Sequence, residues 1–220
     1  YTIAIDVVMP DGRTLQVASV HHYRDQWARA FDVTYEDASG NQQYVHQTTY
    51  GMSERLLGAI VASHGDDKGL IMPPPVAPVQ VVVIPIISKG DSSDVISESE
   101  RITSELKSAG IRARLDSRDV RPGQKYYDWE IKGVPLRMEI GPRDLANNSV
   151  MCVRRTGGKQ SHSVNNLVDT VRSELDSIGE EMKKQSSDHF NSRIKMLPAF
   201  TIDGTDLIFD QVIEKGVVYE

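Results

Sequence analysis

Alternating apolar and polar residues dominate the first fifty positions of the chain. Residues 1–9 place aromatic or aliphatic side chains at every odd position up to Val7, with small or polar residues between them. The same alternation recurs in residues 15–20, 31–36 and 44–50. A two-residue period is typical of half-buried strands, and the Gly-, Pro- and Asp-containing segments between them are typical of turns. The pattern therefore predicts an antiparallel sheet, with one short helix at residues 24–30.

A helical period follows in residues 53–64. Five side chains fall on one face of this helix: Leu56, Leu57, Ile60, Val61 and His64. Ser53 is placed to cap its N-terminus and Gly65 to cap its C-terminus. The run of three prolines at 73–75, with a fourth at 78, is a stiff connector, and we expect a domain boundary at residue 78.

The segment after the connector has a different character. Residues 80–87 (QVVVIPII) are apolar on both faces, which is typical of a strand covered by helices on both sides. The same periodicities predict helices at 94–109, 124–132 and 165–184 and strands at 111–115, 134–140 and 150–154. This order predicts an α/β domain with a mixed sheet, so the fold class is α/β, or α+β for the whole chain. We expect three regions: 1–78, 79–185 and an incomplete region 186–220.

Composition narrows the class of protein. The chain has 220 residues and a net charge of −6, and no apolar run approaches the roughly 20 residues needed to cross a bilayer, so we expect no membrane partner. Cys152 is the only cysteine, which excludes a disulfide or a cysteine-based zinc site built within the chain and favours the cytoplasm. The chain begins at Tyr1, already in a strand pattern and without a leader pattern, so we expect a piece of a longer protein.

Positive charge is concentrated in one segment. Residues 101–160 carry 13 Lys and Arg against 7 Asp and Glu, a local net charge of +6. A basic segment in an acidic protein is typical of a site for a polyanion, whereas scattered charges on a solvated face are the plainer alternative. Charged residues beside aromatic ones are typical of single-stranded RNA recognition. The candidate RNA contacts are Arg118, Asp119, Lys125, Glu130, Glu139 and Arg143.

Arg55 is the candidate for chemistry in the first region. The helix dipole disfavours a cation in the first helical turn, so stabilisation of the helix does not readily explain an arginine at this position. A guanidinium at this place can lie on a purine ring or bind phosphate; an ordinary surface arginine is the alternative. Gln16, an amide on the open face of a strand, can bind a base or an amino group.

Metal and nucleophile chemistry are disfavoured. His21 and His22 are neighbours on a strand and point apart, with no third ligand at a suitable spacing. Asp66 and Asp67 follow a helix end and precede Lys68-Gly69, which indicates a turn rather than a magnesium site. The chain has no hydrolase triad order, no Walker motif and no dinucleotide-binding glycine pattern. We therefore expect no metal site within the chain.

Two long stretches resemble prolyl-tRNA synthetase of the archaeal and eukaryotic type, a class II aminoacyl-tRNA synthetase. The stretch 50–78, YGMSERLLGAIVASHGDDKGLIMPPPVAP, is similar to the family's third class II motif and the linker after it. The stretch 115–145, LDSRDVRPGQKYYDWEIKGVPLRMEIGPRDL, is similar to its anticodon-binding domain. The resemblance implies the end of a class II antiparallel catalytic sheet, a mixed-sheet anticodon-binding domain and the start of a third domain.

The resemblance also implies an activity: activation of proline with ATP and Mg²⁺, then transfer of the prolyl group to tRNA(Pro). Arg55 is then the motif 3 arginine that packs on adenine and contacts the triphosphate, and is the catalytic candidate. The implied ATP contacts are Gln16, Ser19, Ser53 and Arg55, and the implied proline contacts are His21 and Gly51. Adenylation needs positioning and charge neutralisation rather than a nucleophile. A homodimer is expected for the intact enzyme, and DNA is not expected as a partner.

The chain departs from the family pattern in two places. Val17-Ala18-Ser19-Val20-His21 stands where relatives often have a glycine-rich run, and Tyr23-Arg24-Asp25 where relatives have Leu-Gly-Gln. The family's first two motifs and its C-terminal domain, which binds zinc in some members, are expected to lie outside this chain. We therefore expect the chain alone to form no prolyl-adenylate and its open sheet edge to favour self-association. The alternatives are a synthetase for threonine, glycine or histidine and a non-catalytic tRNA-binding paralogue.

Overall fold

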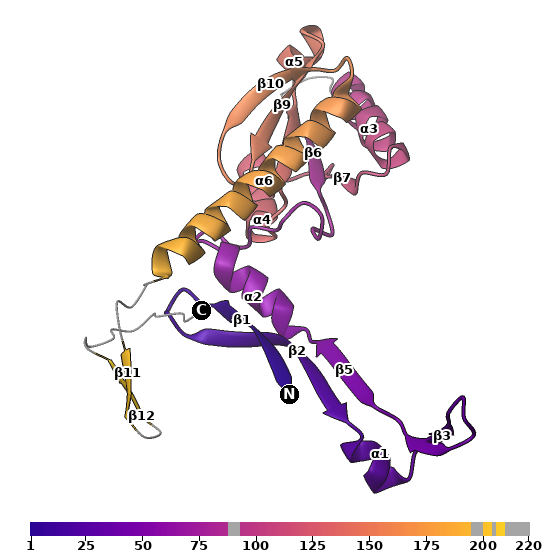
Figure 1. Cartoon of the computed structure of the whole chain (residues 1–220). Coiled ribbons are helices and arrows are strands. Elements are labelled where there is room, and N and C mark those ends of the chain that lie inside the picture. Colours follow the sequence, from indigo (N-terminus) through magenta and orange to yellow (C-terminus); the bar gives the residue numbers. More distant parts are fainter. Residues whose placement is uncertain (88–92, 195–199, 204–205, 210–220) are drawn as a thin grey trace. The chain divides into compact units, whose positions relative to one another are not determined.

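The computed structural model describes residues 1–87, 93–194, 200–203 and 206–209 of the chain. The described residues form two compact units (Figure 1). Unit 1 comprises Tyr1–Ser63 and the described residues from Arg193 onward, and unit 2 comprises His64–Ser192. The functional regions 1–78, 79–185 and 186–220 stay a prediction; the second compact unit itself begins at His64.

Unit 1 is built on a three-stranded antiparallel sheet. Its strands are β1 (Thr2–Val8), β2 (Thr14–Arg24) and β5 (Gln47–Met52), in the order β1-β2-β5. The other elements of the unit are α1 (Gln26–Phe31), β3 (Thr34–Glu36), β4 (Gln42–Tyr44), α2 (Arg55–His64), β11 (Phe200–Asp203) and β12 (Asp206–Phe209). The antiparallel sheet expected from the alternating segments is confirmed.

The apolar side of this sheet is largely exposed. Ile3 and Ile5 are 53% and 49% exposed, and Tyr50 and Met52, which lie on the same side by strand register, are 79% and 71% exposed. The buried apolar residues among the described part of unit 1 are Val17, Ala28 and Ala59. The prediction that β1 is half-buried is therefore wrong within the described residues, because no described element covers its apolar side.

A bulge between β1 and β2 decides which side chains share a face. Ile5 pairs with Ala18, but the next residue, Asp6, pairs with Gln16, so Val17 is an extra residue on β2. Strict alternation along β2 would put Gln16 and Ser19 on opposite faces of the sheet. The extra residue resets the alternation and places both on the face opposite Ile3 and Ile5.

Unit 2 is a five-stranded mixed sheet with helices on both faces. The strand order is β10-β9-β8-β6-β7, with β6 parallel to β7 and β8, and β9 antiparallel to β8 and β10. The strands are β6 (Val81–Pro85), β7 (Ala113–Leu115), β8 (Leu136–Ile140), β9 (Ser149–Arg154) and β10 (Lys159–Ser163). The helices are α3 (Ser93–Ser108), α4 (Pro122–Ile131), α5 (Pro142–Ala146) and α6 (Leu167–Arg193). The mixed α/β fold expected from the sequence is confirmed.

Two cores form on the two faces of this sheet. Val81 and Val83 of β6 face a large core that includes residues of α3 and α6, whereas Val82 and Ile84 face a smaller core with Trp129 of α4. All four β6 side chains are fully buried. This burial on both sides is the reason that the strand is apolar at consecutive positions. Figure 1 shows the helices on either side of the strands.

The proline connector, which belongs to unit 2, is hydrogen-bonded to the rest of this unit at several backbone carbonyls. Arg112 donates from Nε to Ala77 O at 2.8 Å and from Nη2 to Pro74 O and Pro75 O, both at 2.9 Å. Gln80 Nε2 donates to Pro74 O at 3.1 Å. One guanidinium thus satisfies three backbone carbonyls and fixes the course of the connector.

The residues just before the connector pack closely against the end of α4. Leu70 N–H donates to Ile131 O at 3.0 Å. A Cβ at Gly69, where φ is +127°, would lie 2.5 Å from Ile131 Cα, and a Cβ at Gly133, where φ is +69°, would lie 2.7 Å from the backbone of Leu70. Both positions therefore require glycine for space as well as for conformation.

Several elements differ from the sequence-based expectation. The strand expected at 44–50 is interrupted, because β4 ends at Tyr44 and β5 begins at Gln47. Neither β10 nor α5 was expected, because Lys159–Ser163 has no apolar alternation and α5 has only five residues. Helix α6 continues to Arg193, beyond the predicted end at 184, through residues that are almost all exposed and polar.

Gly133→Ala is expected to lower the free energy of unfolding of unit 2 by about 2–4 kcal/mol, since the new Cβ would overlap the Leu70 backbone at a positive φ. Gly179→Ala is the matched control, because Gly179 lies inside α6 with no atom within 4 Å of the Cβ position. It should raise the unfolding free energy by roughly 0.5–1 kcal/mol. Urea denaturation followed by circular dichroism checks both, and a stabilising Gly133→Ala would contradict the tight packing.

Candidate nucleotide site and RNA interface

Several residues that were expected to bind ATP or proline lie on one face of the unit 1 sheet. Ser19 of β2 pairs with Gly51 of β5, and His21 lies two residues along β2 on the same face. Gln16 joins them because of the bulge. A Cβ at Gly51 would meet no described atom within 4 Å, so packing within the chain leaves the space above this glycine open.

His21 is held between two hydroxyl groups. Its Nδ1 lies 2.9 Å from Thr2 Oγ1, and its Nε2 lies 3.0 Å from Ser19 Oγ. The ring also stacks on Tyr23, with centroids 5.5 Å apart and planes inclined by 6°. Because both ring nitrogens have partners, the imidazole is fixed in orientation and presents a flat side to the sheet face.

Arg55 and Ser53 occupy the start of α2. Arg55 Nη1 donates to Gln16 O at 3.0 Å, which brings the guanidinium to the bulged part of β2. This bond uses one of the five donors of an exposed side chain, and the described residues offer the others no partner. Ser53 Oγ accepts from Arg55 N–H at 3.3 Å and so caps the helix as expected. The contact of Ser53 with ATP stays a prediction.

A cluster around Asp116 joins the end of β7 to α4. The buried carboxylate accepts from Arg118 Nε at 2.9 Å, from Arg118 Nη2 at 2.8 Å and from Trp129 Nε1 at 2.7 Å. Arg118 also pairs with Asp128 at 2.8 Å. The bonds from Arg118 outweigh the effect of burial and, with the bond from Trp129, lower the pKa of Asp116 to about 2. The cluster is a satisfied internal network.

This network changes the interpretation of two candidate RNA contacts. Lys125 is 2% exposed, its Nζ donates to Asp116 O at 3.0 Å, and burial lowers its pKa. This side chain is part of the packing of α4, and its contact with RNA stays a prediction. Arg118 is half exposed, but three of its nitrogens are already committed to Asp116 and Asp128.

A second charged cluster, the Glu139 cluster, lies on the α4 side of the sheet. Arg137 Nε donates to Glu139 at 3.0 Å, Lys159 Nζ lies 3.3 Å from the other oxygen of Glu139, and the Arg137 guanidinium lies over the Tyr126 ring at 4.0 Å. Strand register explains the grouping, since Arg137, Val153 and Lys159 face one another across β8, β9 and β10. Burial, with the charge of Glu139, raises the pKa of Tyr126.

Sequence reasoning named Glu139 as a candidate but did not name its partners in this cluster, Arg137 and Lys159. Arg137 was visible in the alternation of 134–140, whereas Lys159 lies on a strand that the apolar pattern did not reveal. Among the other candidates, Asp119 and Arg143 are exposed, and their side chains form no hydrogen bond or ion pair in the described part of the chain. Glu130 is half-buried in the last turn of α4. The structure thus brings Glu139 into one cluster with new partners, while Asp119, Glu130 and Arg143 stay separate predictions.

Much of the local positive charge is used inside unit 2. Arg154 pairs with Glu174 at 2.6 Å, and Arg101 pairs with Glu98 at 2.7 Å. The basic side chains of 101–160 that are exposed and lack an acidic partner in the described residues are Lys107, Arg112, Arg114, Arg121, Lys132 and Arg143, and among these Arg112 is bonded to the connector carbonyls. The net charge of the segment therefore overstates the charge that a polyanion can contact.

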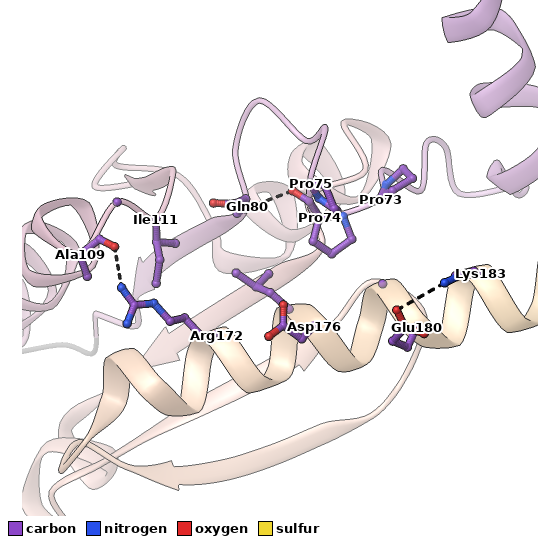
Figure 2. A pocket seen from close by; sticks show the side chains of 13 residues that line it. Pro73, Pro74, Pro75, Gln80, Ala109, Ile111, Arg172, Asp176, Glu180 and Lys183 are labelled. Atoms are coloured by element: carbon purple, nitrogen blue, oxygen red, sulfur yellow. Dashed lines mark hydrogen bonds and ion pairs between the residues drawn. The ribbon is translucent and has the colours of Figure 1, made fainter.

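A groove of about 610 Å³ lies on the other side of the unit 2 sheet. Figure 2 shows it between the connector prolines and α6, with Arg172 bonded to Ala109 O and Glu180 paired with Lys183. Its apolar wall includes Ile111 and Leu175, which belong to the core under α3 and α6. The groove is therefore not part of the Glu139 cluster.

The described residues contain neither a cluster suited to a metal ion nor a membrane-spanning helix. No group of three or more His, Cys, Asp or Glu side chains there is arranged to hold a metal ion. No helix in the same residues is long and apolar enough to span a membrane.

Comparison with known proteins identifies relatives for nearly the whole chain. Residues 80–174 match the family model "Anticodon binding domain". The chain is 46% identical over 219 residues to "Proline--tRNA ligase" of Thermococcus kodakarensis, covering 99% of this chain and 45% of that protein. It is 48% identical over 216 residues to the protein of the same name from Methanosarcina mazei, covering 98% and 43%. The chain thus spans less than half the length of these relatives, and the resemblance to the archaeal type is confirmed.

Asp116→Asn is expected to lower the unfolding free energy by roughly 2 kcal/mol near neutral pH, because a shift of one pKa unit corresponds to about 1.4 kcal/mol. The folded pKa is lowered from 3.8 to about 2, so the stabilisation is present above pH 3.8 and is lost as the pH falls through 2. Urea denaturation at pH 7, 4 and 2.5 should show the two proteins converging in acid. A difference that does not vary with pH would mean that the substitution acts through packing alone.

Proposed function

We propose that this chain, a homologue of archaeal proline--tRNA ligases over 99% of its length, is part of a prolyl-tRNA synthetase. In the longer protein the reaction is ATP-dependent activation of proline followed by transfer to tRNA(Pro). Residues 1–78 end the catalytic domain, residues 79–185 recognise the anticodon, and residues 186–220 begin a third domain. The observation that carries the proposal is the Glu139 cluster, which lies inside the match to the anticodon binding domain.

The chemistry of the Glu139 cluster suits recognition of unpaired guanines. A carboxylate accepts hydrogen bonds from a guanine amino group, and a guanidinium donates two parallel bonds to a guanine edge. Arg137 has Nη donors beyond the Nε bond to Glu139, and Tyr126 beneath it keeps the guanidinium flat. Lys159, whose side chain is 57% exposed, supplies a charge for a phosphate. Asp119, Glu130 and Arg143 are proposed as further contacts at the margins of the interface.

The polar face of the unit 1 sheet supports the proposed ATP and proline sites. Arg55 is anchored by one bond to Gln16 O and retains donors for the adenine-side and triphosphate contacts. Ser19 and Gln16 lie on the same face, and the open space above Gly51 fits a small amino acid beside His21. These residues fit the substrates by position and by donor type.

The proposed role of these residues is to hold the reacting groups. Arg55 lies on the purine and neutralises phosphate charge, while Gln16, Ser19 and Ser53 fix the nucleotide. Mg²⁺ would be bound to ATP as part of the substrate and would supply further neutralisation of phosphate charge. The two hydroxyl partners of His21 keep its ring still, so that the flat imidazole bounds the proline ring. No side chain of this set needs to act as a nucleophile.

The remaining proposals concern partners and location. The partners are tRNA(Pro), proline and ATP, the intact enzyme is a homodimer, and the protein acts in the cytoplasm. The names of the relatives and the matched domain support a tRNA partner.

Arg137→Gln is expected to weaken binding of this chain to a proline tRNA transcript about 10-fold and to remove its preference over a transcript with both anticodon guanines replaced. The reason is that a base-reading contact contributes about 1–3 kcal/mol of discrimination. Lys159→Gln should weaken both transcripts equally and reduce the salt slope by about 1, as a phosphate contact does.

Arg172→Gln on the opposite side of the sheet is the control for both variants. Fluorescence titration at two salt concentrations measures all four proteins. Equal binding of the two transcripts by the unsubstituted chain would argue against anticodon recognition and favour a nonspecific basic surface.

Gly51→Ala is expected to leave the stability of this chain unchanged within about 0.5 kcal/mol, because the new methyl group meets no described atom. In a protein of the relatives' full length it should raise the KM for proline about 10-fold or more and change the KM for ATP little. Proline-dependent ATP–pyrophosphate exchange measures this. An unchanged KM for proline would remove Gly51 from the proposed pocket.

A further inference from the structure

Arg155, which follows β9, is almost fully buried and uses its whole guanidinium within unit 2. Its side chain is 3% exposed. Nη1 donates to Asp66 Oδ2 at 2.9 Å, Nη2 donates to Asp66 Oδ1 and to Gly69 O, and Nε donates to Glu130 O at 3.2 Å. Its backbone N–H donates to Pro135 O at 2.9 Å. Arg155 thus joins two segments, the α4–β8 turn (residues 130–135) and the segment 66–72.

The α4–β8 turn connects residues of the proposed anticodon interface. Glu130 begins the turn, and Arg137 of the Glu139 cluster follows two residues after its end. Arg155 bonds to the carbonyls at both ends of the turn, those of Glu130 and Pro135. A shift of this turn would therefore move two proposed RNA contacts together.

The segment 66–72 is hydrogen-bonded to the same turn through its backbone. Leu70 N–H donates to Ile131 O, and Met72 N–H donates to Gly133 O at 3.1 Å. The contacts at Gly69 and Gly133 leave no room for a methyl group on either side. The segment and the turn are therefore in close backbone contact, and the Arg155–Asp66 ion pair adds a charged interaction between the same two regions.

We propose that Arg155 is a positioning residue for anticodon recognition, and that segment 66–72, which precedes the matched region 80–174, is a working part of the anticodon-binding unit. This inference rests on the proposed function. Arg155 and Asp66 do not contact the RNA themselves. They fix the α4–β8 turn so that Arg137 and Glu139 keep the geometry that base recognition requires.

The charge on both partners makes the contact sensitive to substitution. The buried guanidinium would lose its only acidic partner among the described residues if Asp66 were neutralised, and a buried charge left unpaired is costly. The bond from Arg155 lowers the pKa of Asp66 to about 2, so the pair stays ionised at neutral pH.

The test uses the whole 220-residue chain with Arg155→Gln, Asp66→Asn and the control Asp169→Asn. Asp169 is 81% exposed and pairs with the surface Arg172 at 3.7 Å, so it matches the chemistry of Asp66→Asn without the buried partner. Each protein is titrated with a proline tRNA transcript and with the transcript whose two anticodon guanines are replaced, at two salt concentrations. Hydrogen exchange at the Leu70 and Met72 amides reports the segment directly, and circular dichroism confirms folding.

Arg155→Gln and Asp66→Asn should reduce the ratio of the two affinities about 10-fold, with the salt slope unchanged and with faster exchange at Leu70 and Met72. Asp169→Asn should match the unsubstituted chain. If the unsubstituted chain itself shows no preference, the proposed function fails instead. If it does discriminate, and Asp66→Asn speeds exchange but keeps the full affinity ratio, the positioning role is overturned. Asp66→Asn, the milder change, decides the matter if Arg155→Gln does not fold.

Discussion

Burial of β6 from both sides is the constraint on which unit 2 depends. Four consecutive side chains, Val81–Ile84, are fully buried, two in each of the two cores. Full burial of a valine side chain stabilises the folded state by about 1.5–3 kcal/mol. Both helical layers are needed for β6 to gain this stabilisation on its two faces. The α3 and α6 layer fills the larger core. The α4 layer is smaller and covers only part of its face of the sheet. Charged residues occupy the remainder of that face.

The position of α4 therefore determines which part of this face of the sheet can hold charged side chains. Its Trp129 anchors the helix through the small core and through a bond to Asp116, and its Tyr126 lies under Arg137. Next to it, polar strand positions are only partly covered, so Arg137 and Glu139 can pair with each other without being sealed from a ligand. The same packing produces the buried Asp116 network and the Glu139 cluster. One network stabilises the fold and the other retains unused donors.

Unit 1 depends on a different device. A bulge adds one residue to β2, and this resets the side on which Gln16 emerges. Without it, the candidate nucleotide contacts would be divided between two faces of a sheet. The bond from Arg55 to Gln16 O then ties the start of α2 to the bulged segment. The apolar side of the sheet, with Ile3 and Tyr50 exposed, contributes little to the burial on which the site rests.

The sequence by itself determined the elements whose side chains repeat with a clear period. The fully apolar β6 was predicted because burial on both faces requires apolar side chains at consecutive positions. The strands β1 and β2 were predicted from their two-residue alternation, and α2 from its helical period and its cap. The two long motifs likewise indicated the resemblance to archaeal proline--tRNA ligases, which the comparisons confirm. Local patterns could not determine which distant residues meet. Only the tertiary structure placed Lys159 beside Glu139, buried Lys125 and joined Arg155 to Asp66. Strand order and helix packing bring these residues together, and neither is encoded in the spacing of residues along one segment.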